Sequence, residues 1–188
     1  IKSGGYDIDK LKPQMVAAVI SKAKNELQSV DDFDGNADSK NPKAQAYAAL
    51  FAAYEREKSR NNAFDFDDLI AETVYLFKSH PEVADQYRRK FRHVLVDEYQ
   101  DTNASQYELL KLLAGKGQCL AAVGDDDQSI YAWRGASLEN LRVLSSDYPN
   151  LQVIKLEQNY RSSQRILQAA YGLIAANPKL YPKTLWTD

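Results

Sequence analysis

The feature that most constrains the fold of this chain is a short apolar run, Val94 to Val96, that leads directly into the adjacent carboxylates Asp97 and Glu98. A short β-branched run bounded by polar residues is typical of a buried strand in a parallel sheet. Open α/β sheets bind their ligands beyond the carboxyl ends of the strands, so we expect the two acids at a ligand site. Neighbouring carboxylates repel each other, which favours a role in holding a cation or moving a proton. The alternative is a strand that ends in a solvated acidic turn.

From Phe91 onwards, the sequence pattern alternates between strands and helices. Strands are predicted at 93–96, 118–123 and 151–156, and helices at about 103–114, 137–145 and 162–176. Alternation of this kind favours a parallel sheet with right-handed crossover connections. This half of the chain is therefore predicted to be α/β.

The first ninety residues read as helical instead. Apolar residues recur at helical spacing in four segments, at about 13–27, 44–60, 65–77 and 82–90. The stretch from Asp31 to Pro42 contains Gly35 and two asparagines and is predicted to be a flexible connection.

The composition excludes some classes of protein and leaves others open. The net charge is −2, so a nucleic-acid-binding track, if present, must be local. The single cysteine, Cys119, lies in an apolar run and is predicted to be a buried strand residue, which suits a reducing compartment. No apolar run is long enough to cross a membrane and no signal peptide is visible, so we expect a cytoplasmic protein without membrane contacts.

Polar side chains also follow the second predicted strand, where Gly124 leads into the run Asp125–Asp127 and then Gln128. An amide such as Gln128 can both donate and accept hydrogen bonds, which suits a group that senses a phosphate or positions a water molecule. The three aspartates form either a metal site or a solvated turn. We expect a turn for most of them.

Aromatic and cationic residues continue this pattern. Tyr131 and Trp133 alternate with small residues and are candidates for stacking on unpaired bases, although Trp133 alone also fits a half-buried surface aromatic. After the third predicted strand, Tyr160 is either a platform for a planar ring or a core residue. Arg161 is placed either to meet an anion or to form an ordinary surface ion pair.

Three stretches together carry a more specific signal. They are Asp97-Glu-Tyr-Gln-Asp-Thr102, Gly124-Asp-Asp-Asp-Gln-Ser-Ile-Tyr-Ala-Trp-Arg-Gly-Ala136 and Leu156-Glu-Gln-Asn-Tyr-Arg-Ser-Ser163. In this order they resemble the second, third and fourth helicase motifs of the UvrD/Rep group of superfamily-1 DNA helicases, with the nearest match to Rep. The upstream stretch Asn62-Ala-Phe-Asp-Phe-Asp-Asp-Leu-Ile70 is also similar to this group.

The resemblance implies a role for each position in the nucleotide site. Asp97 would hold Mg²⁺, and Glu98 would share the metal site and act as the base that activates the hydrolytic water. Gln128 would contact the γ-phosphate of ATP, and Arg161 would neutralise charge on the transferring phosphoryl group. Tyr160 would stack on the adenine.

The resemblance implies DNA-binding roles for four further residues: Trp133, Tyr131, Arg134 and Phe66. Stacking of bases on aromatic side chains tolerates any sequence, which a translocating motor requires. The implied cofactors are ATP and Mg²⁺. The implied partners are single-stranded DNA and junctions of single- and double-stranded DNA, with movement in the 3′→5′ direction.

The resemblance also implies a division of the chain into three parts. Residues 1–76 would be a helical accessory subdomain (1B-like), residues 77–156 the second half of a RecA-like motor domain (1A-like), and residues 157–188 the start of a second motor domain (2A-like). The expected fold class is thus α/β, with a helical accessory subdomain followed by part of a RecA-like P-loop parallel sheet with flanking helices. ATP would lie between the two motor domains.

The phosphate-binding signature Gly-x-x-x-x-Gly-Lys-[Ser/Thr] does not occur in the 188 residues. We therefore interpret the chain, which starts at Ile1, as an internal helicase fragment that is inactive alone and lacks its flanking segments. Its exposed sheet edge would favour dimerisation. Two alternatives remain: a subunit of a helicase–nuclease, and a non-enzymatic module that binds single-stranded DNA.

Overall fold

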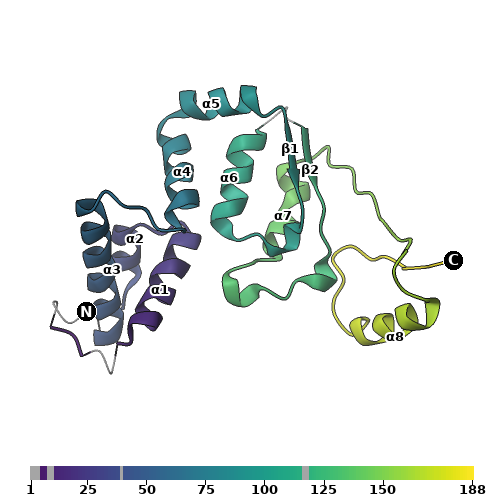
Figure 1. Ribbon diagram of the computed structural model, residues 1–188, viewed down its shortest axis with the longest axis horizontal. Coiled ribbons are helices and arrows are strands. Elements are labelled where there is room, and N and C mark those ends of the chain that lie inside the picture. Colours follow the sequence, from purple (N-terminus) through teal and green to yellow (C-terminus); the bar gives the residue numbers. More distant parts are fainter. Residues whose placement is uncertain (1–4, 8–10, 39, 116–118) are drawn as a thin grey trace.

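A computed structural model describes residues 5–7, 11–38, 40–115 and 119–188 of the chain. Figure 1 shows α1 to α3 gathered at the N-terminal end, α4 and α5 leading away from them, and a small sheet flanked by α6 and α7. The helices are α1 (Pro13–Asn25), α2 (Val30–Asn36), α3 (Pro42–Arg60), α4 (Asp68–Ser79), α5 (Pro81–Lys90), α6 (Ala104–Ala114), α7 (Glu139–Asp147) and α8 (Gln164–Ile174). The strands are β1 (His93–Val96) and β2 (Cys119–Ala122). None of the helices in the described ranges has the length and apolar content needed to span a bilayer.

The helical N-terminal part has its own apolar core, which confirms the predicted helical periodicity. The buried side chains of this core come from the start of α1 to the middle of α3: Leu11, Val16, Ile20, Ala23, Leu50 and Phe51. Proline at the first position of α1 and α3 suits a helix start, because the missing N–H would have no partner there.

The flexible connection predicted between Asp31 and Pro42 is wrong over its first half, because α2 lies there. Ser29 and Asp32 form a reciprocal capping box: the Ser29 hydroxyl accepts from the Asp32 N–H, and the Asp32 carboxylate accepts from the Ser29 N–H. Val30 and Phe33 also pack against the helical core. The cap and this packing outweigh the helix-breaking tendency of Gly35.

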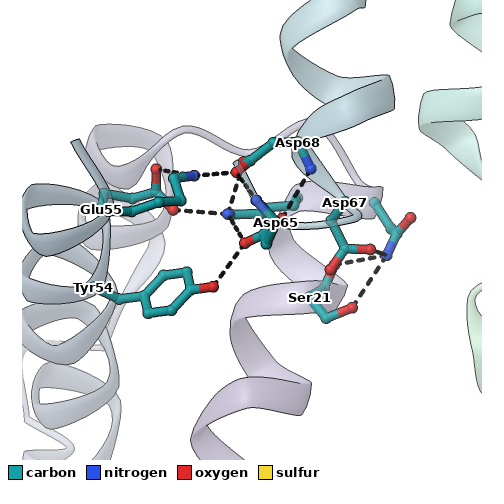
Figure 2. A network of polar contacts seen from close by, with 9 residues as sticks. Ser21, Tyr54, Glu55, Asp65, Asp67 and Asp68 are labelled. Atoms are coloured by element: carbon teal, nitrogen blue, oxygen red, sulfur yellow. Dashed lines mark hydrogen bonds and ion pairs between the residues drawn. The ribbon is translucent and has the colours of Figure 1, made fainter. Parts of the chain in front are cut away.

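Charged side chains from three helices meet in the helical part, at the start of α4 (Figure 2). The Lys24 ammonium contacts Asp65 Oδ2 at 2.5 Å, Asp68 Oδ1 at 2.8 Å and Glu55 Oε1 at 2.8 Å. The Lys58 ammonium contacts Asp68 Oδ2 at 2.5 Å and Glu55 Oε2 at 2.7 Å. We call these five residues the ion network. Asp68 is 1% exposed and Lys24 is 5% exposed, so the charges depend on one another for solvation.

The ion network predicts an acid-dependent loss of stability. Burial alone would raise the pKa of Asp65, but hydrogen bonds from Lys24, the Asp68 N–H and Tyr54 lower this pKa to about 2. The ordinary value is about 4, so the unfolded chain takes up this proton first as the pH falls. The contribution of Asp65 to stability is therefore present above about pH 4 and is lost as the pH falls towards the pKa of about 2 in the folded chain.

Urea unfolding of the wild type and of Asp65→Asn measures this effect. The difference in unfolding free energy between them should be largest near neutral pH and should shrink as the pH falls from about 4 to about 2. Replacing the exposed Asp31 by asparagine serves as the control. A wild-type advantage over Asp65→Asn that stays constant down to about pH 2 would contradict the expectation.

The two strands form a parallel pair, as predicted, in the register His93↔Cys119 to Val96↔Ala122. The pairing continues past the strand ends, because the Val123 N–H donates to the Val96 carbonyl at 2.8 Å and the Tyr99 N–H donates to the Val123 carbonyl at 2.9 Å. α6 makes the crossover between the strands. The second core contains Tyr99 and Tyr107 together with Leu141 and Leu144 of α7.

The prediction that the first strand is buried on both faces is wrong. Alternate side chains of a strand point to opposite faces. Val96 and Leu120 pack against the second core, whereas Leu95 on the other face is 79% exposed. Cys119 shares this exposed face, so its predicted burial is also wrong.

No strand forms at residues 151–156, where the sequence predicts one. This stretch is extended, but no β-ladder joins it to another segment of the described chain. Ile154 and Leu156 are accordingly 79% and 75% exposed. The nearest pairing is an isolated bridge between Gln158 and Trp186. An apolar run becomes a strand only when a neighbour accepts its backbone hydrogen bonds. For the second predicted strand, residue 118 lies outside the described residues.

Candidate functional site

The acidic pair stands at the carboxyl end of β1, as the sequence predicts. Both Asp97 and Glu98 are exposed. Glu98 has φ 49° and ψ 43°, in the left-handed region that side chains other than glycine seldom adopt. The Glu98 N–H donates to Asp97 Oδ1 at 2.9 Å. This backbone conformation turns the chain sharply after the strand and leaves both carboxylates at the rim of the sheet.

A buried glutamine connects this pair to the end of β2. Gln100 is 1% exposed; its Nε2 donates to Glu98 Oε2 at 2.7 Å, and its Oε1 accepts from the Asp125 N–H at 3.0 Å. Asp125 Oδ2 in turn accepts from Gln128 Nε2 at 2.8 Å. We call this chain of contacts the glutamine bridge. It brings together Glu98 and Gln128, which the sequence assigned to one site. The role of Gln100 itself was missed, although a buried amide can both donate and accept.

The glutamine bridge requires the backbone just after β2 to approach residues 97–102 closely, a stretch that we call the acidic turn. A Cβ atom on Gly124 would lie 3.0 Å from Gln100 Oε1 and 3.3 Å from Tyr99 Cβ. The glycine before the three aspartates is therefore needed for space, because its φ is ordinary.

Replacing Gln100 by leucine should lower the free energy of unfolding by about 1–3 kcal/mol, because the Asp125 N–H would lose its partner inside the protein. Urea denaturation measures the loss. Gln168→Leu, at an exposed position on α8, is the matched control and should change stability little. Equal losses in the two variants would show that the glutamine bridge contributes nothing.

The expectation that most of the three aspartates lie in a solvated turn is wrong. The Lys183 ammonium contacts Asp125 and lies 3.4 Å from Asp127 Oδ2, and Lys179 also contacts Asp127. Asp126 Oδ2 accepts from the Leu180 N–H at 2.8 Å. Two lysines far along the sequence offset most of the repulsion between the three carboxylates, and this weakens the electrostatic reason for a metal ion here.

The same contacts set the ionisation of Asp125. Burial would raise its pKa, but hydrogen bonds from Lys183 and Gln128 hold the pKa below its ordinary value. The pKa of Lys183 changes in the opposite direction: burial would lower it, whereas contacts with the aspartates raise it. Both groups are therefore charged near neutral pH, and Asp125 remains an acceptor for Gln128.

Two aromatic rings and a guanidinium group form a compact cluster after this turn. The Arg134 guanidinium lies 4.6 Å from the centroid of the Trp133 ring and 5.3 Å from that of Tyr131. Trp133 is 73% exposed, so the alternative of a half-buried aromatic is wrong. Gly135, with φ 88°, closes the turn that holds these residues. An exposed ring next to a cation is suited to stacking on bases and neutralising phosphates.

Hydrogen bonds connect the segment that follows residues 131–135, which we call the aromatic turn, to the acidic turn. Asn140, 7% exposed, donates from Nδ2 to the carbonyl of Thr102 at 2.9 Å and to that of Asn103 at 3.2 Å. The Ser137 N–H also donates to the Thr102 carbonyl, at 3.0 Å. The two stretches therefore share one rigid support, since buried amides with satisfied partners hold a fixed geometry.

The structure does not bring Tyr160 and Arg161 into contact with the acidic pair. In the described part of the chain, no hydrogen bond or ion pair joins either side chain to Asp97, Glu98 or Gln128. The Tyr160 ring is 85% exposed, so the alternative of a core residue is wrong, and its hydroxyl donates to Gln158 at 2.6 Å. Phe66, predicted to contact DNA, is 91% exposed in the loop before α4.

Comparisons with known proteins show the family to which the chain belongs. The family model described as the UvrD/REP helicase N-terminal domain matches residues 2–149, so the chain belongs to the UvrD/REP helicase family. Among curated proteins, it is similar to the ATP-dependent DNA helicase PcrA of Staphylococcus epidermidis (strain ATCC 35984), at 46% identity over 187 residues. It is 47% identical over 187 residues to the ATP-dependent DNA helicase PcrA of Staphylococcus aureus (strain Mu50).

Both alignments cover 100% of this chain and 25% of the relative, so the chain spans about a quarter of the length of these proteins. The resemblance to UvrD/Rep helicases and the α/β fold class are thus confirmed.

Proposed function

We propose that this chain supplies part of the nucleotide site and part of the DNA-binding surface of an ATP-dependent DNA helicase that moves 3′→5′ on single-stranded DNA. The observation that carries the proposal is the glutamine bridge, because it links Glu98 to Gln128 across the carboxyl ends of two parallel strands. Ligand sites of open α/β sheets lie at this edge.

Two acidic stretches, Asp97–Glu98 and Asp125–Asp127, lie at this edge, and their charged neighbours differ. The difference supports Asp97 and Glu98 as the residues that would hold Mg²⁺. Within the described ranges, neither carboxylate has a lysine or arginine partner, whereas the run Asp125–Asp127 contacts both Lys179 and Lys183. Exposed carboxylates without a cationic partner offer the oxygen ligands and negative charge that Mg²⁺ prefers. Bound ATP would supply the reactive phosphoryl group, and Mg²⁺ would balance the negative charge of its phosphate oxygens.

The protein side chains would then act around that phosphoryl group. Gln100 holds one oxygen of Glu98, which would fix the carboxylate so that it accepts a proton from the attacking water. Gln128 would contact the γ-phosphate and exchange its present contact with Asp125 for that one. Tyr160 and Arg161 would reach the nucleotide only after the C-terminal part closes on the sheet, with Arg161 balancing the charge of the phosphoryl group.

We assign residues 1–76 to a helical accessory subdomain, 77–156 to part of a RecA-like motor domain and 157–188 to the start of a second motor domain. α4 crosses the first of these boundaries. Because the phosphate-binding loop signature is missing from the sequence, the isolated chain should not hydrolyse ATP. The exposed side chains of Leu95, Ile154 and Leu156 favour self-association of the isolated chain.

The proposed partners are single-stranded DNA and its junctions with duplex, and the DNA contact can be tested on the chain itself. Titration of a labelled oligothymidine should show binding that Trp133→Ala weakens by about 1–3 kcal/mol, which is roughly 5- to 150-fold. Trp186→Ala is the control, because Trp186 lies outside the aromatic turn. If both variants bind like the wild type, the assigned DNA surface is wrong.

A further inference from the structure

The ion network fixes the backbone of the loop that leads into α4. The Asp65 N–H donates to Asp68 Oδ2 at 2.8 Å, and the Asp68 N–H donates back to Asp65 Oδ1 at 2.9 Å. The Tyr54 hydroxyl of α3 donates to Asp65 Oδ2 at 2.9 Å. The loop at 61–67 is therefore attached through Asp65 to α1, α3 and α4, as Figure 2 shows.

This anchored loop carries two aromatic side chains that are not packed. Phe64 is 71% exposed and Phe66 is 91% exposed, on either side of Asp65, which lies in the network. Burying ionised groups is costly, so a buried ion network is weak evidence for added stability and fits better with holding one geometry. Two phenylalanines exposed on a rigid loop have no role in the core and are available to a ligand.

A groove next to the loop indicates the kind of ligand. Phe66 lines it together with Val16 and Ile20 of α1 and Arg56 and Arg60 of α3, and its volume is about 770 Å³. Three carboxylates also line it, those of Glu57, Asp65 and Asp67, so the arginines are the positive part of a groove of mixed charge. Arg60 lies 3.6 Å from Glu57, and both side chains are largely exposed. Aromatic faces for bases next to arginines for phosphates are the combination used to bind single strands.

The loop is also tied to the acidic turn. Asn25, the last residue of α1, donates from Nδ2 to Asp67 Oδ1 at 3.0 Å and accepts at Oδ1 from Asn103 Nδ2 at 2.6 Å. Asn103 is the N-cap of α6, directly after the acidic turn. A DNA strand bound at the loop would therefore contact a segment that is hydrogen-bonded, through Asn25 and Asn103, to the acidic turn.

We propose that the ion network positions Phe64 and Phe66 as a pair of base-stacking side chains beside the α1–α3 groove, and that Phe64 is an additional contact for single-stranded DNA. The proposal rests on the DNA-binding function proposed above. It assigns Lys24 and Lys58, together with Asp65 at the edge of the groove, as positioning residues that act through the loop.

The test is fluorescence anisotropy of a labelled oligothymidine with the 188-residue chain, combined with amide hydrogen exchange. Phe64→Ala should weaken binding by about 5- to 150-fold, like Phe66→Ala. Tyr54→Phe removes one hydroxyl and keeps the ring, so the chain should stay folded; it should speed exchange within 61–67 and weaken binding several-fold. Lys58→Met should do the same more strongly, and Lys58→Arg should restore part of the affinity.

Lys22→Met is the matched control on α1, because Lys22 is exposed and its ion pair within the described residues is with Glu26 of the same helix, at 3.8 Å. If Trp133→Ala weakens binding while Phe64→Ala and Tyr54→Phe bind like the wild type, the positioning proposal fails and the DNA-binding function stands. If the wild type binds no oligonucleotide, both fail. If Tyr54→Phe or Lys58→Met loses affinity without faster exchange in 61–67, the positioning role of the network is overturned.

Discussion

Glu98→Gln in a full-length helicase carrying this chain is expected to reduce DNA-stimulated ATP turnover by about 10²- to 10⁴-fold, the usual contribution of a general base. Glutamine keeps an acceptor oxygen for Gln100 Nε2, which now donates to Glu98 at 2.7 Å, so the glutamine bridge and the fold should persist. The lost function is the ability to take a proton from water. Phosphate release under saturating ATP measures the turnover number.

The matched control is Glu139→Gln. Glu139 is exposed at the start of α7 and pairs with Arg142 at 3.6 Å, away from the acidic turn. The control should retain full turnover. The Glu98 variant should lose much less ATP affinity than turnover, because Asp97 would still hold Mg²⁺ and the larger loss lies in the chemical step. A Glu98→Gln enzyme with wild-type turnover would remove the general base from the proposed mechanism.

Asp68→Ala is expected to lower the free energy of unfolding by about 3–5 kcal/mol, because it leaves buried cations without their partner. Asp68 contacts Lys24 at 2.8 Å and Lys58 at 2.5 Å, and it is 1% exposed. Its removal also deprives the Asp65 N–H of its acceptor. The effect should appear in urea denaturation followed by circular dichroism.

Asp34→Ala provides the comparison, since Asp34 is an exposed aspartate on α2. It should change stability by less than about 0.5 kcal/mol, as surface substitutions usually do. Similar small losses for Asp68→Ala and Asp34→Ala would mean that water reaches the ion network and that its charges are solvated without each other.

Local pattern was enough to predict most helices and the two paired strands, because amphipathic spacing and short apolar runs depend on neighbouring residues. The capping box of α2 was also readable from Ser29 and Asp32, but Gly35 drew the prediction towards a loop. The exposure of Leu95 and the missing strand at 151–156 depend on which neighbours cover or pair with a segment. Sequence pattern alone does not contain that information.

The residues of the candidate site also fall into two groups: those that local sequence pattern predicts and those whose roles depend on distant neighbours. The placement of Asp97, Glu98 and Gln128 at one sheet edge could be predicted because they follow two parallel strands, which end at the same edge. The lysine partners of Asp125 were missed because Lys183 lies at the other end of the chain's α/β half. Gln100 was missed because its role comes from burial between two strand ends, and neither its type nor its spacing signals this.

The contacts of Lys179 and Lys183 have a mechanical consequence. Gln128 and Lys183 hold the same carboxylate, that of Asp125, so these contacts connect the turn bearing Gln128 to the segment after α8. If the proposed contact with nucleotide draws Gln128 away from Asp125, Lys183 would become the main partner of that carboxylate. The segment after α8 would then be the part of the chain that responds to the change.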